Sequence, residues 1–270
     1  MEDAKLSCYI LTKNSERRLN QVLLSVVGVV DDLVVLDSGS SDRTIEIAKS
    51  FGARILHREF DNFSNQRNYG LSQCVHDWVF ELDSDEVVSA PLQQKILALK
   101  KSGFEVEGGV PDAFGILREW FVLERKVNCF YPIRCPDQPL RIYQRKKVSY
   151  KTDRLVHESP VGHQTSWRVD EPLLHYSCDT VDQMYSKINQ YTTLAAREMF
   201  QSRKKSGWFK IVAYPWLVWF KYYVVLGGWK DGPIGLIHGR YVRDNVWQYL
   251  VKLKFDFGRE ARSVDWFLRV

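Results

Sequence analysis

The chain lacks the cysteine patterns that mark zinc proteins and disulfide scaffolds. Its 270 residues include five cysteines, an odd number, and no two of them stand at CxxC spacing. Zinc sites usually show such pairs together with histidines, and disulfide frameworks usually show an even set. Neither a structural zinc site nor a disulfide framework is indicated, and we expect a reducing, cytosolic environment.

Features of an export signal are also missing at the start of the sequence. The stretch MEDAKLSCYILTKN carries acids where a signal peptide carries Lys or Arg, and its apolar run is short. We therefore expect a protein that no N-terminal signal exports. At 45% hydrophobic residues, the chain can bury a sizeable core in one large domain or two smaller ones.

Positive charge is concentrated in the last third of the chain. Residues 181–270 carry 15 Lys and Arg against 7 Asp and Glu, whereas residues 1–180 carry 23 against 26. The net charges are +8 and −3 respectively. We expect the two parts to face different partners.

Short runs rich in β-branched residues alternate with stretches of helical periodicity in the first ninety residues. The predicted strands are 6–12, 32–38, 53–57 and 77–83. The predicted helices are SERRLNQVLLSVV, SDRTIEIAKSFG and SNQRNYGLSQC. Ser41 or Asp42 is expected to cap the second helix and Gly52 to end it. This alternation predicts a mostly parallel sheet with flanking helices, which binds ligands at the carboxyl ends of its strands.

Acidic residues cluster where the fourth predicted strand ends, in WVFELDSDEVVS, residues 78–89. Asp83 and Asp85, two positions apart, can both approach a Mg²⁺ ion that also binds substrate phosphates. Asp37 ends the second strand, so its carboxylate is expected in the same crevice. The alternatives are a solvated turn whose acids cap the helix that follows, and an Asp37 that only caps its own next helix.

Four motifs in this order resemble the N-terminal half of the family 2 glycosyltransferases of the GT-A fold, which transfer sugars from nucleotide diphosphates. YILTKNSERRLNQVLLSV is similar to the first strand and helix of that family, and VVLDSGSSDRT to its VDDGSTDGT loop. NQRNYGL is similar to its ARNxGL segment, and LDSDE to its DxD motif. The resemblance implies a Rossmann-like α/β fold, a nucleotide-sugar donor, and a divalent metal, either Mg²⁺ or Mn²⁺.

The same resemblance implies which residues form the donor site. It assigns nucleotide or diphosphate contacts to Thr12, Asn14, Asp37, Arg67 and Asp83. It assigns metal binding to Asp83 and Asp85. The family loop often has two consecutive acids, but here the second position is Ser38, so only Asp37 carries over. Without the resemblance, Arg67 reads equally well as a cation on a helix surface.

The stretches PDQPLRIYQRKKVSYKTDRLVHESPV and EPLLHYSCDTVDQMYSKINQYTTLAAR resemble the lipopolysaccharide-core subgroup, β-1,4-glucosyltransferases that act on inner-core heptose. In that subgroup an RLxHE stretch, an HY stretch and a KxxxY helix recur in this order. The resemblance implies that Glu158 is the base of an inverting transfer, which removes the proton of the acceptor hydroxyl. It also implies that His175 is a third metal ligand or a diphosphate contact. Lys187 and Tyr191 share one helix face and are expected to reach the diphosphate.

Each of these assignments has an alternative. Glu158 can instead form a surface pair with Lys151 or Arg154, and Glu119 in LREWF is a rival base. A histidine beside an apolar run, such as His175, is often a core residue. Lys187 and Tyr191 can instead belong to an ordinary helix face that has no role in binding.

An aromatic stretch, WFKIVAYPWLVWFKYYVVLGGW at residues 208–229, dominates the last third. A spanning helix needs about 20 apolar residues, and Pro215 and Lys221 interrupt this one. Aromatic residues interleaved with Lys and Arg on both sides predict a segment that lies in the headgroup layer of an anionic membrane. A buried helical pair or a dimer interface is the alternative. No RRM, OB or helix-turn-helix signature supports a nucleic-acid partner.

We therefore predict a GT-A catalytic domain over residues 1–178 and a helical, membrane-associating region over residues 179–270. The expected reaction is a metal-dependent, inverting transfer of a hexose, glucose from UDP-glucose, onto a lipid-linked saccharide such as the lipopolysaccharide inner core. The expected location is the cytoplasmic face of the inner membrane, where the protein is peripheral. The alternatives are a polyprenyl-phosphate sugar transferase, a nucleotidyltransferase that releases pyrophosphate, and a non-catalytic membrane scaffold.

Overall fold

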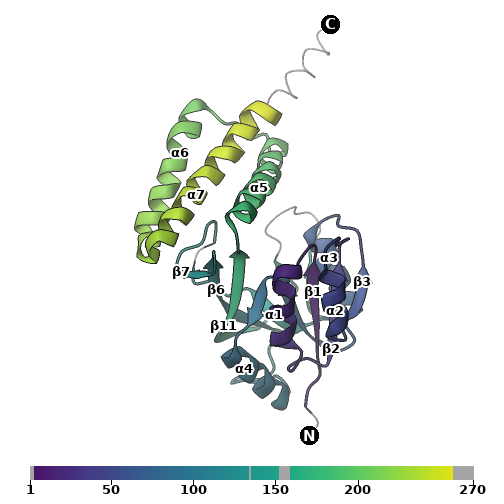
Figure 1. Cartoon of the computed structure of the whole chain (residues 1–270). Helices are drawn as coiled ribbons and strands as arrows, with labels where there is room; N and C mark the ends of the chain where they lie inside the picture. Colours follow the sequence, from purple (N-terminus) through teal and green to yellow (C-terminus); the bar gives the residue numbers. More distant parts are fainter. Residues whose placement is uncertain (1–2, 134, 152–158, 258–270) are drawn as a thin grey trace. The chain divides into compact units, whose positions relative to one another are not determined.

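The computed structural model describes residues 3–133, 135–151 and 159–257 (Figure 1). The chain forms two compact units. Unit 1 comprises Met1–Glu119 and Pro136–Tyr176, and unit 2 comprises Trp120–Cys135 and Ser177–Val270. The catalytic and membrane-associating roles predicted for residues 1–178 and 179–270 stay predictions.

Unit 1 begins with four parallel strands. Their order across the sheet is β3 (Arg54–His57), β2 (Asp32–Asp37), β1 (Leu6–Thr12) and β4 (Trp78–Asp83). The helices between them along the chain are α1 (Glu16–Val26), α2 (Thr44–Ser50) and α3 (Phe63–Gln73). The strand–helix alternation that the sequence predicts is confirmed. Pairing places Thr12 beside Asp37 and Leu11 beside Asp83, so the carboxyl ends of these strands meet at one edge.

The rest of the sheet contains four antiparallel pairs, which corrects the prediction of a mostly parallel sheet. Beyond β4 the order is β8 (Leu140–Gln144), β6 (Ala113–Val122), β11 (Ser166–Cys178) and β5 (Glu86–Val88). The remaining strands are β7 (Arg125–Val127), which pairs with β6, and the separate pair β9 (Ser149–Tyr150) and β10 (Pro160–Val161). Parallel neighbours need a long crossover, usually a helix. Between α4 (Ala90–Lys101) and β11 the described residues contain no helix, so these strands return directly.

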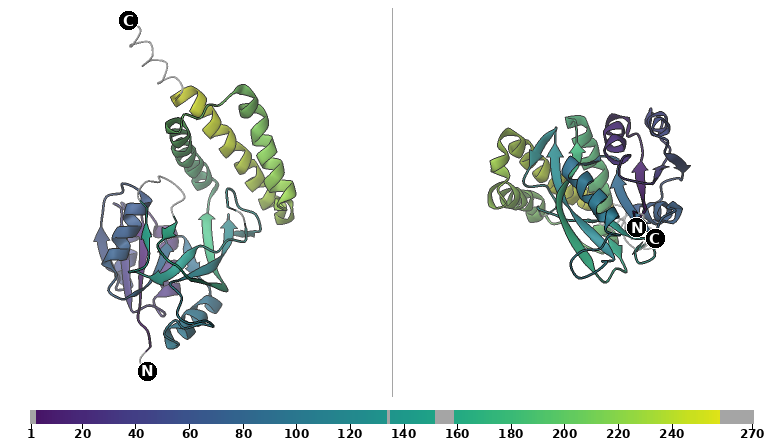
Figure 2. Two further views of the ribbon diagram at one scale, coloured as in Figure 1. Left: turned by 180° about the vertical axis from the view of Figure 1, so that it is seen from behind. Right: turned by 90° about the horizontal axis from the view of Figure 1, so that it is seen from below.

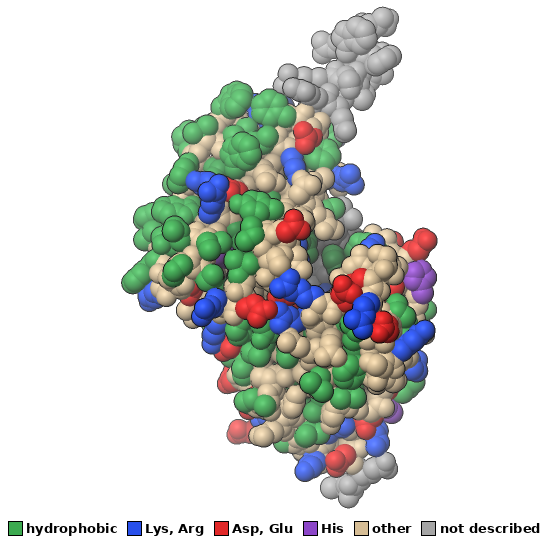
Figure 3. Space-filling model, in the orientation of Figure 1, with side chains coloured by type: hydrophobic (Ala, Val, Ile, Leu, Met, Phe, Trp, Pro, Cys, Tyr) green, Lys and Arg blue, Asp and Glu red, His purple; other side chains and the backbone are tan. Residues whose placement is uncertain are grey.

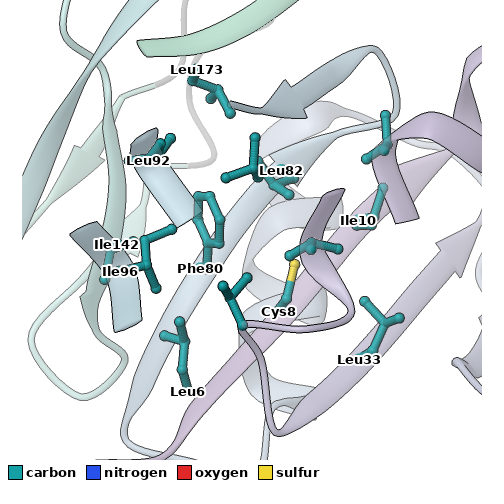
Figure 4. Close-up of a cluster of buried hydrophobic side chains, with 14 of the residues drawn as sticks. Leu6, Cys8, Ile10, Leu33, Phe80, Leu82, Leu92, Ile96, Ile142 and Leu173 are labelled. Atoms are coloured by element: carbon teal, nitrogen blue, oxygen red, sulfur yellow. The ribbon is translucent and has the colours of Figure 1, made fainter. Parts of the chain in front are cut away.

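Helices cover both faces of the parallel part (Figures 1 and 2). On one face, α1 and α4 pack against side chains of β1 and β4 in the main core (Figure 4). The labelled members of that core are Leu6, Cys8, Ile10, Leu33, Phe80, Leu82, Leu92, Ile96, Ile142 and Leu173. On the other face, Leu71 of α3 packs against Tyr9 and Val79. A Cβ atom at Gly70 would lie 2.6 Å from the Tyr9 ring, so only glycine allows α3 to approach β1 this closely.

Unit 2 contains the longer helices. These are α5 (Val181–Gln201), α6 (Trp208–Phe220) and α7 (Gly232–Lys252), with the short helical turns η1 (Lys221–Val225), η2 (Gly228–Asp231) and η3 (Leu253–Phe257). Helices α6 and α7 lie side by side in every view and share a core of Ile211, Val218, Val242, Val246 and Leu250. Among the described residues, no helix has both the length and the hydropathy that crossing a bilayer requires.

Candidate donor-binding site

Three loops are joined by hydrogen bonds at the carboxyl edge of the parallel strands. Asn14, which follows β1, donates its backbone N–H to the Ser40 hydroxyl and accepts from the Ser41 N–H, each at 2.8 Å. The Ser15 hydroxyl donates to the Ser84 hydroxyl after β4, also at 2.8 Å. The loops that follow β1, β2 and β4 are thereby held together where ligands of α/β sheets bind.

The carboxylate of Asp37 shapes the loop after β2. Its Oδ2 accepts from the backbone N–H groups of Gly39 and Ser40 at 2.9 Å, and its Oδ1 accepts from the Thr12 hydroxyl at 3.3 Å. Gly39 has φ +90°, a value that favours glycine. Asp42, not Asp37, satisfies the start of α2, since it accepts from the Thr44 N–H at 3.0 Å. Asp37 is thus not the cap of the next helix, and its side chain fixes the backbone of its own loop.

The acids at the end of β4 do not form a solvated turn that caps α4. Glu81 and Glu86 are fully buried, while the side chains of Asp83 and Asp85 are 26% and 28% exposed. Ser89 caps α4 instead, because its hydroxyl accepts from the Leu92 N–H. The alternative of a solvated turn is therefore wrong. The buried acids need cations or hydrogen-bond donors from other residues of unit 1.

Glu81 accepts hydrogen bonds from five side chains of unit 1. Its Oε1 accepts from the guanidinium groups of Arg67 and Arg141. Its Oε2 accepts from three hydroxyl groups, those of Tyr9, Tyr143 and Tyr150. Burial, and then the charge of Glu81, raise the pKa values of these tyrosines well above the ordinary value, so the hydroxyls remain neutral donors. A buried carboxylate with five donors is fully satisfied.

The same two arginines hold Asp83 from both sides. Arg67 donates to Oδ1 at 3.0 Å and Arg141 donates to Oδ2 at 2.9 Å. Burial by itself raises the pKa of Asp83, but the charges of Arg67 and then Arg141 outweigh burial and lower it. Arg67 is 8% exposed, so it is not the surface cation of the alternative interpretation. We call Glu81, Asp83, Glu86, Arg67 and Arg141 the arginine–carboxylate network.

Glu86 connects this network to His175. Its Oε1 accepts from Arg141 at 2.6 Å and from Arg118 at 3.3 Å, and lies 3.2 Å from Nδ1 of His175. Burial opposes ionisation of Glu86, yet Arg141 and His175 hold its pKa well below the ordinary range. The other ring nitrogen of His175, Nε2, lies 3.8 Å from Oδ2 of Asp85. An Nδ1–H group that faces Glu86 leaves Nε2 directed towards Asp85.

Asp85 and His175 are two of the predicted metal ligands, and their side chains lie 3.8 Å apart at this edge. A carboxylate and an imidazole are suitable protein ligands, and a cation bound to substrate phosphates needs only one or two carboxylates from the protein. Across the described ranges, no group of three or more His, Cys, Asp or Glu side chains forms a complete metal site. The metal roles of Asp83, Asp85 and His175 stay predictions.

The structure brings most of the predicted donor-site residues together in unit 1. These are Thr12, Asn14, Asp37, Arg67, Asp83, Asp85 and His175. Lys187 and Tyr191 lie on α5 in unit 2, where Lys187 donates to the Ser177 carbonyl and Tyr191 is 42% exposed. Glu158 lies outside the described residues. The rival base Glu119 is partly buried on β6. The roles of all these residues stay predictions.

Sequence reasoning did not identify the partners that surround Asp83. Glu81 lies in an apolar strand, WVFELD, and Arg141 lies in another, LRIYQ, so each is a buried charge that requires a partner. That signal was present in the sequence. Pairing these two, however, requires the sheet order, because 60 residues separate them along the chain.

Comparison with known proteins identifies the family of the chain. The sequence model of Glycosyl transferase family 2 matches residues 7–167, more than half of the chain. The protein belongs to this family, and it is therefore a glycosyltransferase.

Two relatives match over most of their length. An uncharacterized glycosyltransferase of Rickettsia typhi is 27% identical over 228 residues, which cover 80% of this chain and 75% of that protein. The lipopolysaccharide core biosynthesis glycosyltransferase LpsC of Rhizobium meliloti is 26% identical over 243 residues, which cover 86% and 85%. Among solved structures, that of S. aureus TarS 1-349 in complex with UDP has a TM-score of 0.47 at 14% identity, with 95% of this chain and 92% of that chain covered.

Proposed function

We propose that this glycosyltransferase moves a hexose, glucose from UDP-glucose, with inversion onto a lipid-linked saccharide such as the lipopolysaccharide inner core. The observation that carries the proposal is the set of three loops joined at the carboxyl edge, with Asp37 on one and Asp83 and Asp85 on another. Membership of family 2 supports a sugar donor, and favours sugar transfer over nucleotidyl transfer. The relative LpsC supports a lipopolysaccharide acceptor.

In this proposal the loops after β1 and β2 bind the nucleoside. Thr12 and Asn14 hold the shape of these loops through their hydrogen bonds to Asp37 and Ser41. Asp37 contacts the nucleoside from the loop that its carboxylate orders. Arg67 and Asp83, fixed against each other, lie beside the nucleotide phosphates.

Asp85 and His175, with Asp83 beside them, would hold Mg²⁺ or Mn²⁺ in the proposed site. The chemistry that such a cation supplies when bound is stabilisation of the negative charge on the departing diphosphate. The arginine–carboxylate network keeps Asp83 ionised and oriented, because two guanidinium groups contact its two oxygens. Lys187 and Tyr191 are further proposed contacts of the diphosphate.

The proposed base is Glu158. In an inverting transfer, the acceptor hydroxyl attacks the anomeric carbon while a carboxylate takes its proton and the diphosphate leaves from the opposite side. The test is Glu158→Gln, with Glu119→Gln as the rival. Loss of transfer with unchanged UDP binding in the Glu158 variant alone supports the assignment. The same loss in the Glu119 variant alone moves the role to Glu119.

A lipid-linked acceptor places the reaction at a membrane surface. We propose a peripheral location on the cytoplasmic face of the inner membrane, with anionic lipid as the partner of the basic last third. A polyprenyl-phosphate acceptor is the nearest alternative within the family. Incubation with UDP-glucose and either a lipopolysaccharide inner core or polyprenyl phosphate separates the two by the product formed.

The donor site is tested by calorimetric titration with UDP, GDP and CMP, each with and without Mn²⁺. We expect binding of UDP that depends on Mn²⁺ and is lost in Asp85→Ala. The matched control is Asp77→Ala, since Asp77 is an exposed acid just before the other end of β4. Binding of no nucleotide by the folded protein would contradict the proposed function and favour a non-catalytic scaffold.

A further inference from the structure

Helix α6 is apolar on the face that packs and on the face that does not. Ile211, Pro215 and Val218 are buried, at the spacing of one helix face, and Ile211 and Val218 belong to the core shared with α7. On the outer side, Phe209 is 80% exposed and Trp216 is 53% exposed. A helix on the surface of a soluble domain normally turns polar residues outward. Packing within unit 2 therefore does not explain the outer side of α6.

Exposed apolar residues continue beyond α6 into the rest of this helical pair. We define the α6–α7 apolar face as Phe209, Val212, Trp216, Leu217, Phe220, Val225, Trp229, Leu236, Ile237 and Trp247, all of which are exposed. In the space-filling view, hydrophobic side chains gather over α6 and α7 (Figure 3). Large contiguous apolar patches on soluble proteins mark sites that bind proteins or membranes.

The charges around this face are almost all positive. Residues 203–254 contain 10 Lys and Arg against 2 acids. Both acids already have partners in unit 2, since Asp231 accepts from Asn128 and Asp244 pairs with Arg240 and Arg243. Such a combination of Trp, aliphatic side chains and basic residues complements an anionic phospholipid surface.

A groove of about 330 Å³ opens between α6 and α7 on the same face. Its apolar walls include Ile211, Pro215, Trp216 and Trp247. Arg243 also lines it and stacks on the Trp216 ring, with the guanidinium carbon 4.8 Å from the ring centre. Asp244 lines the groove as well and pairs with both Arg243 and Arg240, so these three side chains together carry a net charge of +1. An apolar groove with a net positive charge at its edge matches a phospholipid, which joins an acyl chain to a phosphate.

We propose that the α6–α7 apolar face lies within the interfacial layer of an anionic bilayer, with a lipid acyl chain in the groove and a lipid phosphate beside Arg243. The inference rests on the proposed function for its biological setting, a lipid-linked acceptor, but the binding itself needs no donor and no turnover. Lys210 and Lys221, both exposed, favour a helix that lies in the surface over one inserted across the bilayer. A second copy of the chain fits less well, because a two-fold contact would bring like charges together.

The experiment is flotation of the full chain with two kinds of vesicle, in the absence of nucleotide. One kind contains phosphatidylcholine alone, and the other contains equal amounts of phosphatidylcholine and phosphatidylglycerol. We expect binding to the anionic vesicles, weakened by salt because salt screens the basic residues. The test variant carries Trp216→Gln, Leu217→Gln and Phe220→Gln together. It should bind at least about tenfold more weakly, since three apolar side chains no longer enter the interface.

The matched control carries Leu24→Gln, Val75→Gln and Val110→Gln, which replace equally exposed apolar residues of unit 1. It should bind vesicles as the unchanged chain does, and far-UV circular dichroism should be the same for all three proteins. Vesicles with brominated acyl chains should quench the tryptophan fluorescence of the bound, unchanged chain.

Three results would each overturn the proposal. They are no binding to anionic vesicles at low salt, equal binding by the test and control variants, and binding without quenching by brominated chains. If the unchanged chain is a dimer that does not bind vesicles, and the test variant is a monomer, the α6–α7 apolar face is an interface between two copies. UDP titration of the same samples is independent of all these outcomes, so a failure here is distinguishable from a failure of the donor site.

Discussion

Unit 1 buries charge, whereas unit 2 exposes apolar side chains. In unit 1, Glu81 and Glu86 are fully buried among arginines at the edge where a donor is proposed to bind. In unit 2, Phe209 and Trp216 stand outside a helix whose other face is also apolar. Each unit departs from the usual rule of apolar inside and charged outside, and each departs at the place where function is proposed.

The two departures have different energetic meanings. Buried charges that contact each other are strongly interdependent, because removing one leaves its partners desolvated and unpaired. Exposed apolar side chains contribute little to folding, since they are in water in the folded state as well. Substitutions in the network of unit 1 should therefore destabilise the fold, while substitutions on the α6–α7 apolar face should change binding alone.

The largest effect is expected for Arg141→Ala. This change leaves Glu81, Asp83 and Glu86 with one fewer buried cation, and we expect a loss of about 3–5 kcal/mol in the free energy of unfolding. Urea denaturation followed by circular dichroism measures it. The control is Arg43→Ala, whose side chain forms an exposed pair with Glu46 and should leave the midpoint unchanged. Equal midpoints for the two variants would contradict a network that depends on mutual pairing.

A second effect concerns His238, a buried residue of α7 in unit 2. Burial lowers the pKa of His238 from 6.5 to about 4, and its Nε2 has no hydrogen-bond partner in the described structure. Because the unfolded chain binds the proton more tightly, stability is full above pH 6.5 and falls as the pH drops towards 4. The shift corresponds to roughly 3 kcal/mol. Thermal unfolding across this pH window should show the loss, and His238→Phe should remove it.

A smaller loss is expected for Gly235→Ala on α7. The added Cβ atom would lie 1.9 Å from the carbonyl oxygen of Gly228, so α7 and η2 must separate. Overpacking of this kind typically destabilises by about 1–3 kcal/mol, although alanine is the better helix former. Gly207→Ala is the control, since nothing lies within 4 Å of its Cβ position. A lower unfolding temperature in both variants would argue against a specific contact.

The smallest effect is expected for Tyr143→Phe, which removes one of the hydroxyl donors to Glu81. Four donors remain, so we expect a loss of only about 1 kcal/mol. Tyr185→Phe, at an exposed position of α5, should have no effect on the urea midpoint. A loss for Tyr143→Phe as large as that for Arg141→Ala would show that the tyrosines, not the arginines, hold the network together.

The sequence by itself determined the local elements of the first ninety residues. The expected strand at 6–12 is β1, and the expected strand at 32–38 ends one residue earlier, at Asp37. Gly52 follows α2 with φ +70°, as the sequence indicates, whereas the N-cap position is Arg43 and Asp42, one residue earlier, accepts from the Thr44 N–H. These features depend on hydrophobic periodicity and on capping residues within a few positions, so local reasoning finds them.

Only the tertiary structure decided the direction of the later strands and the partners of the buried charges. Whether a strand is parallel or antiparallel depends on its neighbour in the sheet. The neighbour of β4 is β8, which is far from β4 in the sequence. The sequence located Asp83, Asp85 and Arg67. It did not show that Arg67 points inward and contacts Asp83 and Glu81, or that Arg141 is the second arginine of the arginine–carboxylate network. Burial and pairing are properties of residues that meet across long chain separations, and a linear pattern does not specify which of them meet.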